Sequence, residues 1–196
     1  MRRLDRVGRA SASLAPAVAV VAILGAALVA PEFSWTDGAL SDLGAPGTPT
    51  AWLFNGGLVL AALLGVPFAT ALAAGARTRL DGLAAASLVV TLALLAGVGL
   101  FPSGHPLHLP VAVGFYLGAT LALWIDGTSS VVVGEPRFGL GTIWLANLHV
   151  LQWLAWAVGL RAGSGLAVPE AIGAALFAAW VLARGRRMGL ATTAAL

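Results

Sequence analysis

The segment Phe101-Pro-Ser-Gly-His-Pro-Leu-His-Leu-Pro110 is a short polar turn between two long apolar stretches, residues 82–101 and 109–125. It contains His105 and His108, two of the three histidines in the chain. Its prolines prevent one continuous helix from running through it. An apolar helix of about 20 residues crosses a bilayer. We therefore expect the turn to lie at one membrane face, together with a second polar loop, residues 31–49.

Composition supports a membrane protein. Of the 196 residues, 59% are hydrophobic and 10% are charged, whereas about a quarter of the residues in a soluble domain are charged. The apolar residues form long uninterrupted runs instead of the amphipathic stripes of soluble helices. At roughly 20 residues per span, the chain has room for about six spans and for little else.

The sequence therefore predicts an all-α, polytopic membrane protein, a bundle of six transmembrane helices that forms one domain over residues 1–196. The first apolar run follows a cluster of arginines, as in a signal peptide. It is too long for a signal peptide, and Pro31 would follow the cleavage site, so we expect it to be retained as a span. The expected spans are residues 12–30, 50–74, 82–101, 109–125, 139–160 and 168–183.

The arginines predict the orientation. All eleven basic residues are arginine, and ten lie at the two termini and in the second and fourth loops; Arg161 is the only one in the other three loops. Cytoplasmic loops are enriched in positive charge, so we expect both termini to lie in the cytoplasm. We expect the membrane to be the plasma membrane. Topology thus accounts for the arginines, and no nucleic-acid partner is expected. The chain has no cysteine, which excludes disulfides and iron–sulfur clusters, and no cofactor is expected.

Three short motifs occur in order along the chain: Leu40-Ser-Asp-Leu-Gly44, Leu53-Phe-Asn-Gly-Gly-Leu58, and Gly99-Leu-Phe-Pro102 followed by His108. Together they resemble the DUF998 family of bacterial and archaeal six-span membrane proteins. Ser41, Asn55, Pro102 and His108 are the positions that match the family pattern. The resemblance implies a topology and candidate positions. It implies no reaction.

Polar residues expected at the outer face provide the first candidate site. Ser41, Asp42 and His108 would form a cluster if spans 2 and 4 are neighbours, and a Ser–His–Asp set is typical of acyl transfer. His105, His108 and Asp42 could alternatively bind a metal, and His105 is also a candidate ligand-binding residue, but a capping, interface-level role is the favoured interpretation of the histidines. Asp37 is interpreted as the N-cap of a short helix that ends at Gly44, with ligand binding as the alternative.

Three further polar residues are expected near the outer face, and one of them, Arg161, has two interpretations. Asn55, about one turn inside span 2, is a candidate ligand-binding residue. Arg161 either pairs with an acid or a lipid phosphate, or simply extends to the interface. Glu170 follows Pro169 at the start of span 6, where an acid complements the helix dipole.

Asn147, His149 and Gln152 form a second candidate site, inside span 5. Polar groups at that depth are costly and usually face the bundle interior. His149 and Gln152 share a helical face, and Asn147 lies about 200° from His149. We expect His149 to be buried and hydrogen-bonded to Asn55, Thr91 or Thr120. The group is either a structural clasp between helices or part of a transport pathway.

Three functions therefore remain open from sequence. The first is a membrane protein whose outer site binds a lipid headgroup or a small amphiphile. The second is an outer-face lipid hydrolase or transferase that uses His108 and Asp42, with or without a metal. The third is a small transporter that uses the polar group of span 5. Membrane lipids are the expected partners, and a second membrane protein or a second copy of the chain is the alternative.

Overall fold

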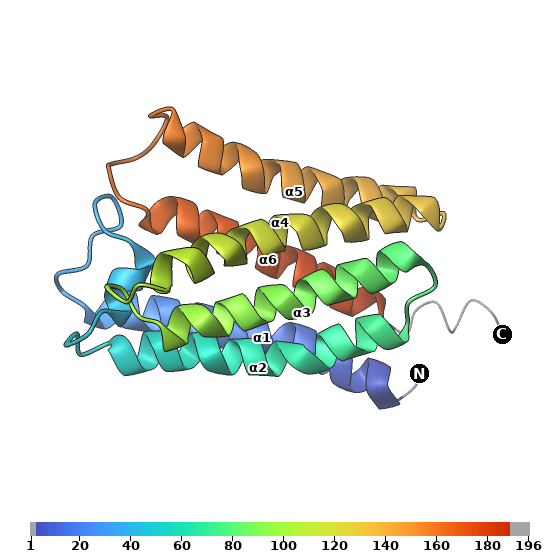
Figure 1. The fold of residues 1–196 in the computed structure, drawn as a ribbon, viewed down its shortest axis with the longest axis horizontal. Helices are drawn as coiled ribbons and strands as arrows, with labels where there is room; N and C mark the ends of the chain where they lie inside the picture. The colour runs from blue at the N-terminus through green and yellow to red at the C-terminus, as the bar shows by residue number, and fades with distance from the viewer. Residues whose placement is uncertain (1–2, 189–196) are drawn as a thin grey trace.

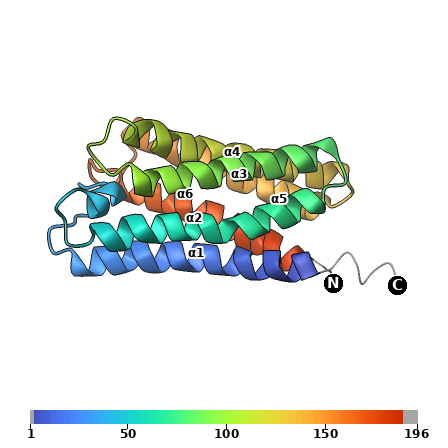
Figure 2. The ribbon, with the colours of Figure 1, turned by 60° about the horizontal axis from the view of Figure 1, so that its bottom comes forward.

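Six long helices lie side by side in the computed structural model, which describes residues 3–188 (Figures 1 and 2). Successive helices run in opposite directions, and α6 returns to pack against α1 (Figure 2). A short 3₁₀ helix, η1, lies in the α1–α2 connection. The bounds are α1 Arg3–Val29, η1 Leu40–Gly44, α2 Ala51–Ala74, α3 Arg79–Leu100, α4 His108–Val132, α5 Pro136–Ala157 and α6 Ala167–Arg187. The predicted all-α class is confirmed for the described residues.

Five of the described helices, α1, α2, α3, α4 and α6, are long and apolar enough to cross a membrane. Helix α5 has 22 residues, but Asn147, His149 and Gln152 reduce its apolar character. The outward surface of the bundle is rich in exposed leucine and valine side chains. Such a continuous apolar surface is unusual for a soluble protein, and it identifies a multi-pass membrane protein.

The two ends of the bundle differ in their connections. The α1–α2, α3–α4 and α5–α6 connections lie together at one end, which we call the loop end (Figure 1). The α2–α3 and α4–α5 connections, the start of α1 and the end of α6 lie at the opposite end, which we call the arginine end. The histidine turn and the loop of residues 31–49 therefore share one end, as the sequence predicts.

Helix α4 is longer than predicted. The expected span ended at residue 125, but the helix continues to Val132 and carries Asp126 inside the bundle, with 2% of its surface exposed. The small residues that follow Asp126 suggest a loop from sequence, yet they allow close packing. A Cβ on Gly127 would lie 2.9 Å from the Gly139 carbonyl of α5, and Ser129 donates a hydrogen bond to Asp81 at 2.6 Å.

Charged pairs join the helices at the arginine end. Arg184 of α6 lies 3.0 Å from Asp126, whose second carboxylate oxygen accepts a 2.9 Å hydrogen bond from Trp180. Glu135, which precedes α5, pairs with Arg187 at 2.7 Å and with Arg77 at 3.3 Å. Arg184 and Arg187 thus connect α6 to its neighbours through ion pairs.

Candidate functional site

The α1–α2 and α5–α6 connections are joined by backbone hydrogen bonds at the loop end. Gly165 donates to the Thr36 carbonyl at 2.7 Å, and Leu166 and Ala167 both donate to the Gly38 carbonyl at 2.8 and 2.9 Å. A Cβ on Gly165 would collide with that Gly38 carbonyl. Glycine at position 165 therefore permits the close approach that fixes η1 against the start of α6.

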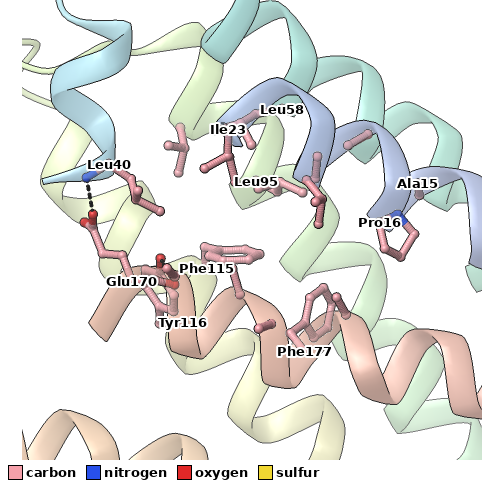
Figure 3. A pocket seen from close by; sticks show the side chains of 18 of the residues that line it. Ala15, Pro16, Ile23, Leu40, Leu58, Leu95, Phe115, Tyr116, Glu170 and Phe177 are labelled. Atoms are coloured by element: carbon pink, nitrogen blue, oxygen red, sulfur yellow. Dashed lines mark hydrogen bonds between the residues drawn. The ribbon is translucent and has the colours of Figure 1, made fainter. Parts of the chain in front are cut away.

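Glu170 holds η1 against α6 with its side chain. Its Oε2 accepts a 2.6 Å hydrogen bond from the Leu40 amide, the first residue of η1 (Figure 3). The sequence interpretation of Glu170 as an acid that complements the helix dipole fits its position in the first turn of α6. It missed the long-range contact, because the two residues are 130 positions apart and no local pattern connects them.

The predicted role of Asp37 is wrong. The short helix begins at Leu40, Ala39 occupies the N-cap position, and the Asp42 carboxylate accepts the Ala39 amide at 2.8 Å. Asp37 instead accepts hydrogen bonds from Thr36 at 2.7 Å and Ser34 at 3.0 Å in an exposed turn. Those hydrogen bonds hold the pKa of Asp37 below its ordinary value. Gly44 is the last residue of the helix, as expected, but in this connection it is Gly47 that has a positive φ, +88°.

An apolar cavity of about 320 Å³ lies next to this junction. It runs between α1, α2, α3, α4 and α6, and Figure 3 shows Phe115 and Phe177 on one side of it and Ile23, Leu58 and Leu95 on the other. Its wall is aliphatic or aromatic over almost its whole length. The polar side chains on the wall are Ser41, His108, Tyr116 and Glu170, all toward the loop end.

Two of the three residues in the predicted Ser–Asp–His cluster line this cavity. Ser41 and His108 are on its wall, while Asp42 is exposed and outside it. His108 Nδ1 pairs with the Phe101 carbonyl at 2.8 Å, and the hydrogen bonds of residues 3–188 join none of the three to another. The geometry therefore gives the acyl-transfer interpretation no support.

The geometry gives the metal alternative no support either. Within the described part of the chain, no three histidine, aspartate or glutamate side chains are grouped so that they could hold a metal ion. His105 is exposed, accepts the Leu107 amide at 3.1 Å and stacks on Phe101 with ring centroids 4.9 Å apart. These contacts shape the turn between α3 and α4, which explains His105 without a ligand.

Asn55 and Arg161 also make local contacts away from the cavity. Asn55 donates to the Gly44 carbonyl at 2.8 Å and so closes the end of η1 onto α2. The Arg161 guanidinium lies 5.1 Å from the ring centre of Trp156, and Trp156 donates to the Gly165 carbonyl at 2.8 Å. Arg161 is exposed and has no acidic partner among the described ion pairs.

His149 is buried as predicted, with 2% of its surface exposed. Its Nδ1 lies 2.7 Å from the hydroxyl of Thr120, one of the three expected partners. Thr120 donates its proton to the Tyr116 carbonyl at 3.0 Å, so it accepts from His149 Nδ1–H. The other ring nitrogen, Nε2, has no hydrogen-bond partner among the described residues, and it faces Gly173 of α6.

The other two polar residues of α5 face different neighbours. Asn147 accepts a 3.0 Å hydrogen bond from Trp124 of α4 on the outer surface, in keeping with its predicted angular separation from His149. Gln152, with its amide oriented to satisfy both neighbours, donates to the Pro169 carbonyl at 3.3 Å and accepts from Trp153 at 2.7 Å. None of the three lines the cavity. Each forms a hydrogen bond from α5 to a neighbouring helix, α4 or α6, as a structural clasp would.

We expect Thr120→Val to lower the free energy of unfolding by about 1–2 kcal/mol, because it leaves the buried His149 Nδ1–H without an acceptor. Thr70→Val is the matched control, since the exposed Thr70 hydroxyl makes the same kind of bond to its own helix, to Val66 at 2.9 Å. Denaturant unfolding in micelles compares the two variants. Equal losses would show that the Thr120–His149 bond does not stabilise the bundle.

A protein-family model described as a protein of unknown function (DUF998) matches residues 13–187 of this chain. The matched region includes most of α1 and all of α2 to α6, together with the cavity. No curated protein and no solved structure matches the chain.

Proposed function

Since the chain belongs to the DUF998 family, whose function is unknown, we propose a function from its geometry: it binds the alkyl chain of an amphiphile inside the bundle. The alkyl chain of the ligand occupies the cavity between α1, α2, α3, α4 and α6. The polar head lies at the loop end, beside Ser41, His108 and Glu170. The observation that carries the proposal is the distribution of polarity in the cavity, which is apolar along its length and polar at one end only.

The bilayer is the source of the ligand in this proposal. Val20 and Leu24 of α1 and Ala175 of α6 line the cavity and are also exposed, with Val20 at 46% and Leu24 at 47%. The cavity therefore reaches the apolar outer surface between α1 and α6. An alkyl chain that enters by this route moves from the apolar bilayer into an apolar cavity. The hydrophobic effect therefore contributes little free energy to its binding. Recognition must then come from shape and from the polar end.

The proposal includes six spans, with α5 crossing the plasma membrane alongside the five more apolar helices and both termini in the cytoplasm. The arginine count supports this orientation, because positive charge is retained on the cytoplasmic side. It puts the loop end, and with it the polar end of the cavity, at the extracytoplasmic face.

Single-cysteine labelling tests this topology without background, because the chain has no cysteine. Cysteine at the exposed Pro106 is expected to react with an impermeant maleimide in intact cells. Cysteine at the exposed Pro136, the first residue of α5, is expected to react only after permeabilisation. The reverse pattern would invert the orientation, and reaction of both in intact cells would remove the span between them.

Binding is tested by photolabelling in reconstituted vesicles with a dodecanol derivative that carries a diazirine near the end of its chain. Labelling is expected to saturate and to fall when excess unlabelled dodecanol is added, because the cavity holds a limited number of alkyl chains. Labelling that rises in proportion to the probe and resists competition would indicate only contact with bulk lipid, and would contradict the proposal.

A further inference from the structure

We propose that the cavity selects a head group that is a cation and a hydrogen-bond donor, so that its ligand class is single-chain, long-chain amines rather than phosphate-bearing lipids. This inference rests on the proposed function and specifies the chemistry of its ligand. The inference follows from the charged and polar groups at the cavity's polar end.

Glu170 is a carboxylate with few partners. It lines the cavity and is only partly exposed, and the Leu40 amide is the one described group that donates to its side chain. No arginine forms an ion pair with it within residues 3–188. A carboxylate removed from water is stabilised by further hydrogen bonds or by an opposite charge. An ammonium group in the cavity would provide both.

His108 adds a second acceptor on the same wall. The Phe101 carbonyl can only accept, so the 2.8 Å contact assigns a proton to His108 Nδ1. In the neutral ring this leaves Nε2 with a free lone pair. The Tyr116 hydroxyl is already used as a donor to the Glu170 carbonyl at 3.1 Å. Apart from the Ser41 hydroxyl, which can donate or accept, and the Trp35 indole N–H at the same end, the groups left for a ligand are the acceptors of Glu170 and His108, and an ammonium group is donor-only.

The charge of the whole loop end favours the same sign of ligand. Among the described residues, four carboxylates lie there, those of Glu32, Asp37, Asp42 and Glu170. Arg161 is the single arginine there, and it lies over Trp156 away from the cavity wall. The formal charges, four negative and one positive, sum to −3. This field attracts a cationic head and repels a phosphate.

The size of the cavity limits the number of alkyl chains that a ligand can place in it. Its volume of about 320 Å³ is at the lower end of the range of roughly 300–1,000 Å³ for ligand pockets. One alkyl chain is a better match to this space than the two chains of a phospholipid. A phospholipid is thus disfavoured by volume as well as by charge.

The experiment displaces the diazirine probe, in vesicles of zwitterionic phosphatidylcholine, with dodecylamine, dodecanol and dodecyl phosphate, which share one tail. Three proteins are compared: wild type, Glu170→Gln and Asp37→Asn. Glutamine at 170 can still accept from the Leu40 amide, so the η1–α6 contact is retained. Asp37→Asn removes one charge from the same end without touching the cavity wall. Comparison between variants in identical vesicles cancels differences in lipid partitioning.

For wild type and Asp37→Asn, dodecylamine is expected to displace the probe at a concentration at least about tenfold lower than either dodecanol or dodecyl phosphate. For Glu170→Gln the advantage of the amine over dodecanol is expected to disappear, while dodecanol still competes. If the phosphate competes as well as the amine, or if Glu170→Gln leaves the amine's advantage intact, the head-group inference is overturned and the cavity remains a tail site. If no compound displaces the probe from wild type, the proposed function itself fails.

Discussion

Replacing Asp126 by asparagine is expected to lower the free energy of unfolding by about 3 kcal/mol, the scale of a buried ion pair that has lost one partner. Asparagine can still accept from Trp180, but it leaves the Arg184 guanidinium without its counter-charge. Only 3% of the Asp126 side chain and 17% of the Arg184 side chain are exposed. The remaining charge would therefore stay largely shielded from water.

Arg187→Gln is the control at the same end of the bundle. Arg187 also pairs with an acid, Glu135, at 2.7 Å, but 40% of its side chain is exposed, and exposed pairs contribute roughly 0–1 kcal/mol. Denaturant unfolding in micelles should rank Asp126→Asn well below Arg187→Gln. Equal stability of the two variants would mean that water or lipid headgroups reach Asp126, and that α4 does not bury it.

The second large effect concerns ligand binding. Ala174→Phe adds a ring to the cavity wall and is expected to reduce saturable labelling by the dodecanol probe at least about tenfold, because a cavity of about 320 Å³ cannot hold both the ring and an alkyl chain. Ala179→Phe is the matched control on the exposed side of the same helix. It should label as wild type does.

Thermal unfolding of both alanine variants distinguishes a filled cavity from a misfolded protein. A filled cavity predicts normal unfolding for Ala174→Phe together with lost labelling. If Ala174→Phe folds normally and labels fully, the probe occupies some other place on the protein.

The helices could be predicted from sequence because they depend on local properties. Apolar runs of bilayer length and the prolines of the histidine turn located the six helices. The end of α4 could not be found in this way. Asp126 and the small polar residues after it resemble a loop, and only packing against Gly139 and the Ser129–Asp81 bond show that the helix continues.

The candidate site was predictable only in part, for a similar reason. Ser41 and His108 were chosen from short motifs and do line the cavity. Glu170 was assigned a local role, because its contact with Leu40 depends on how the first and last connections of the loop end meet. The cavity itself is formed by five long helices together with η1, and no single segment of the sequence predicts a gap between them.

The most direct test of the account is to identify the residues that the dodecanol probe modifies, by mass spectrometry of peptides from photolabelled vesicles. The diazirine is near the end of the tail, so the account predicts labels on interior wall residues such as Phe68, Leu88 and Leu92, which are buried from bulk lipid. Labels confined to lipid-facing residues such as Leu117, Leu121 and Leu151, which are exposed, would contradict the claim that the bundle holds an alkyl chain.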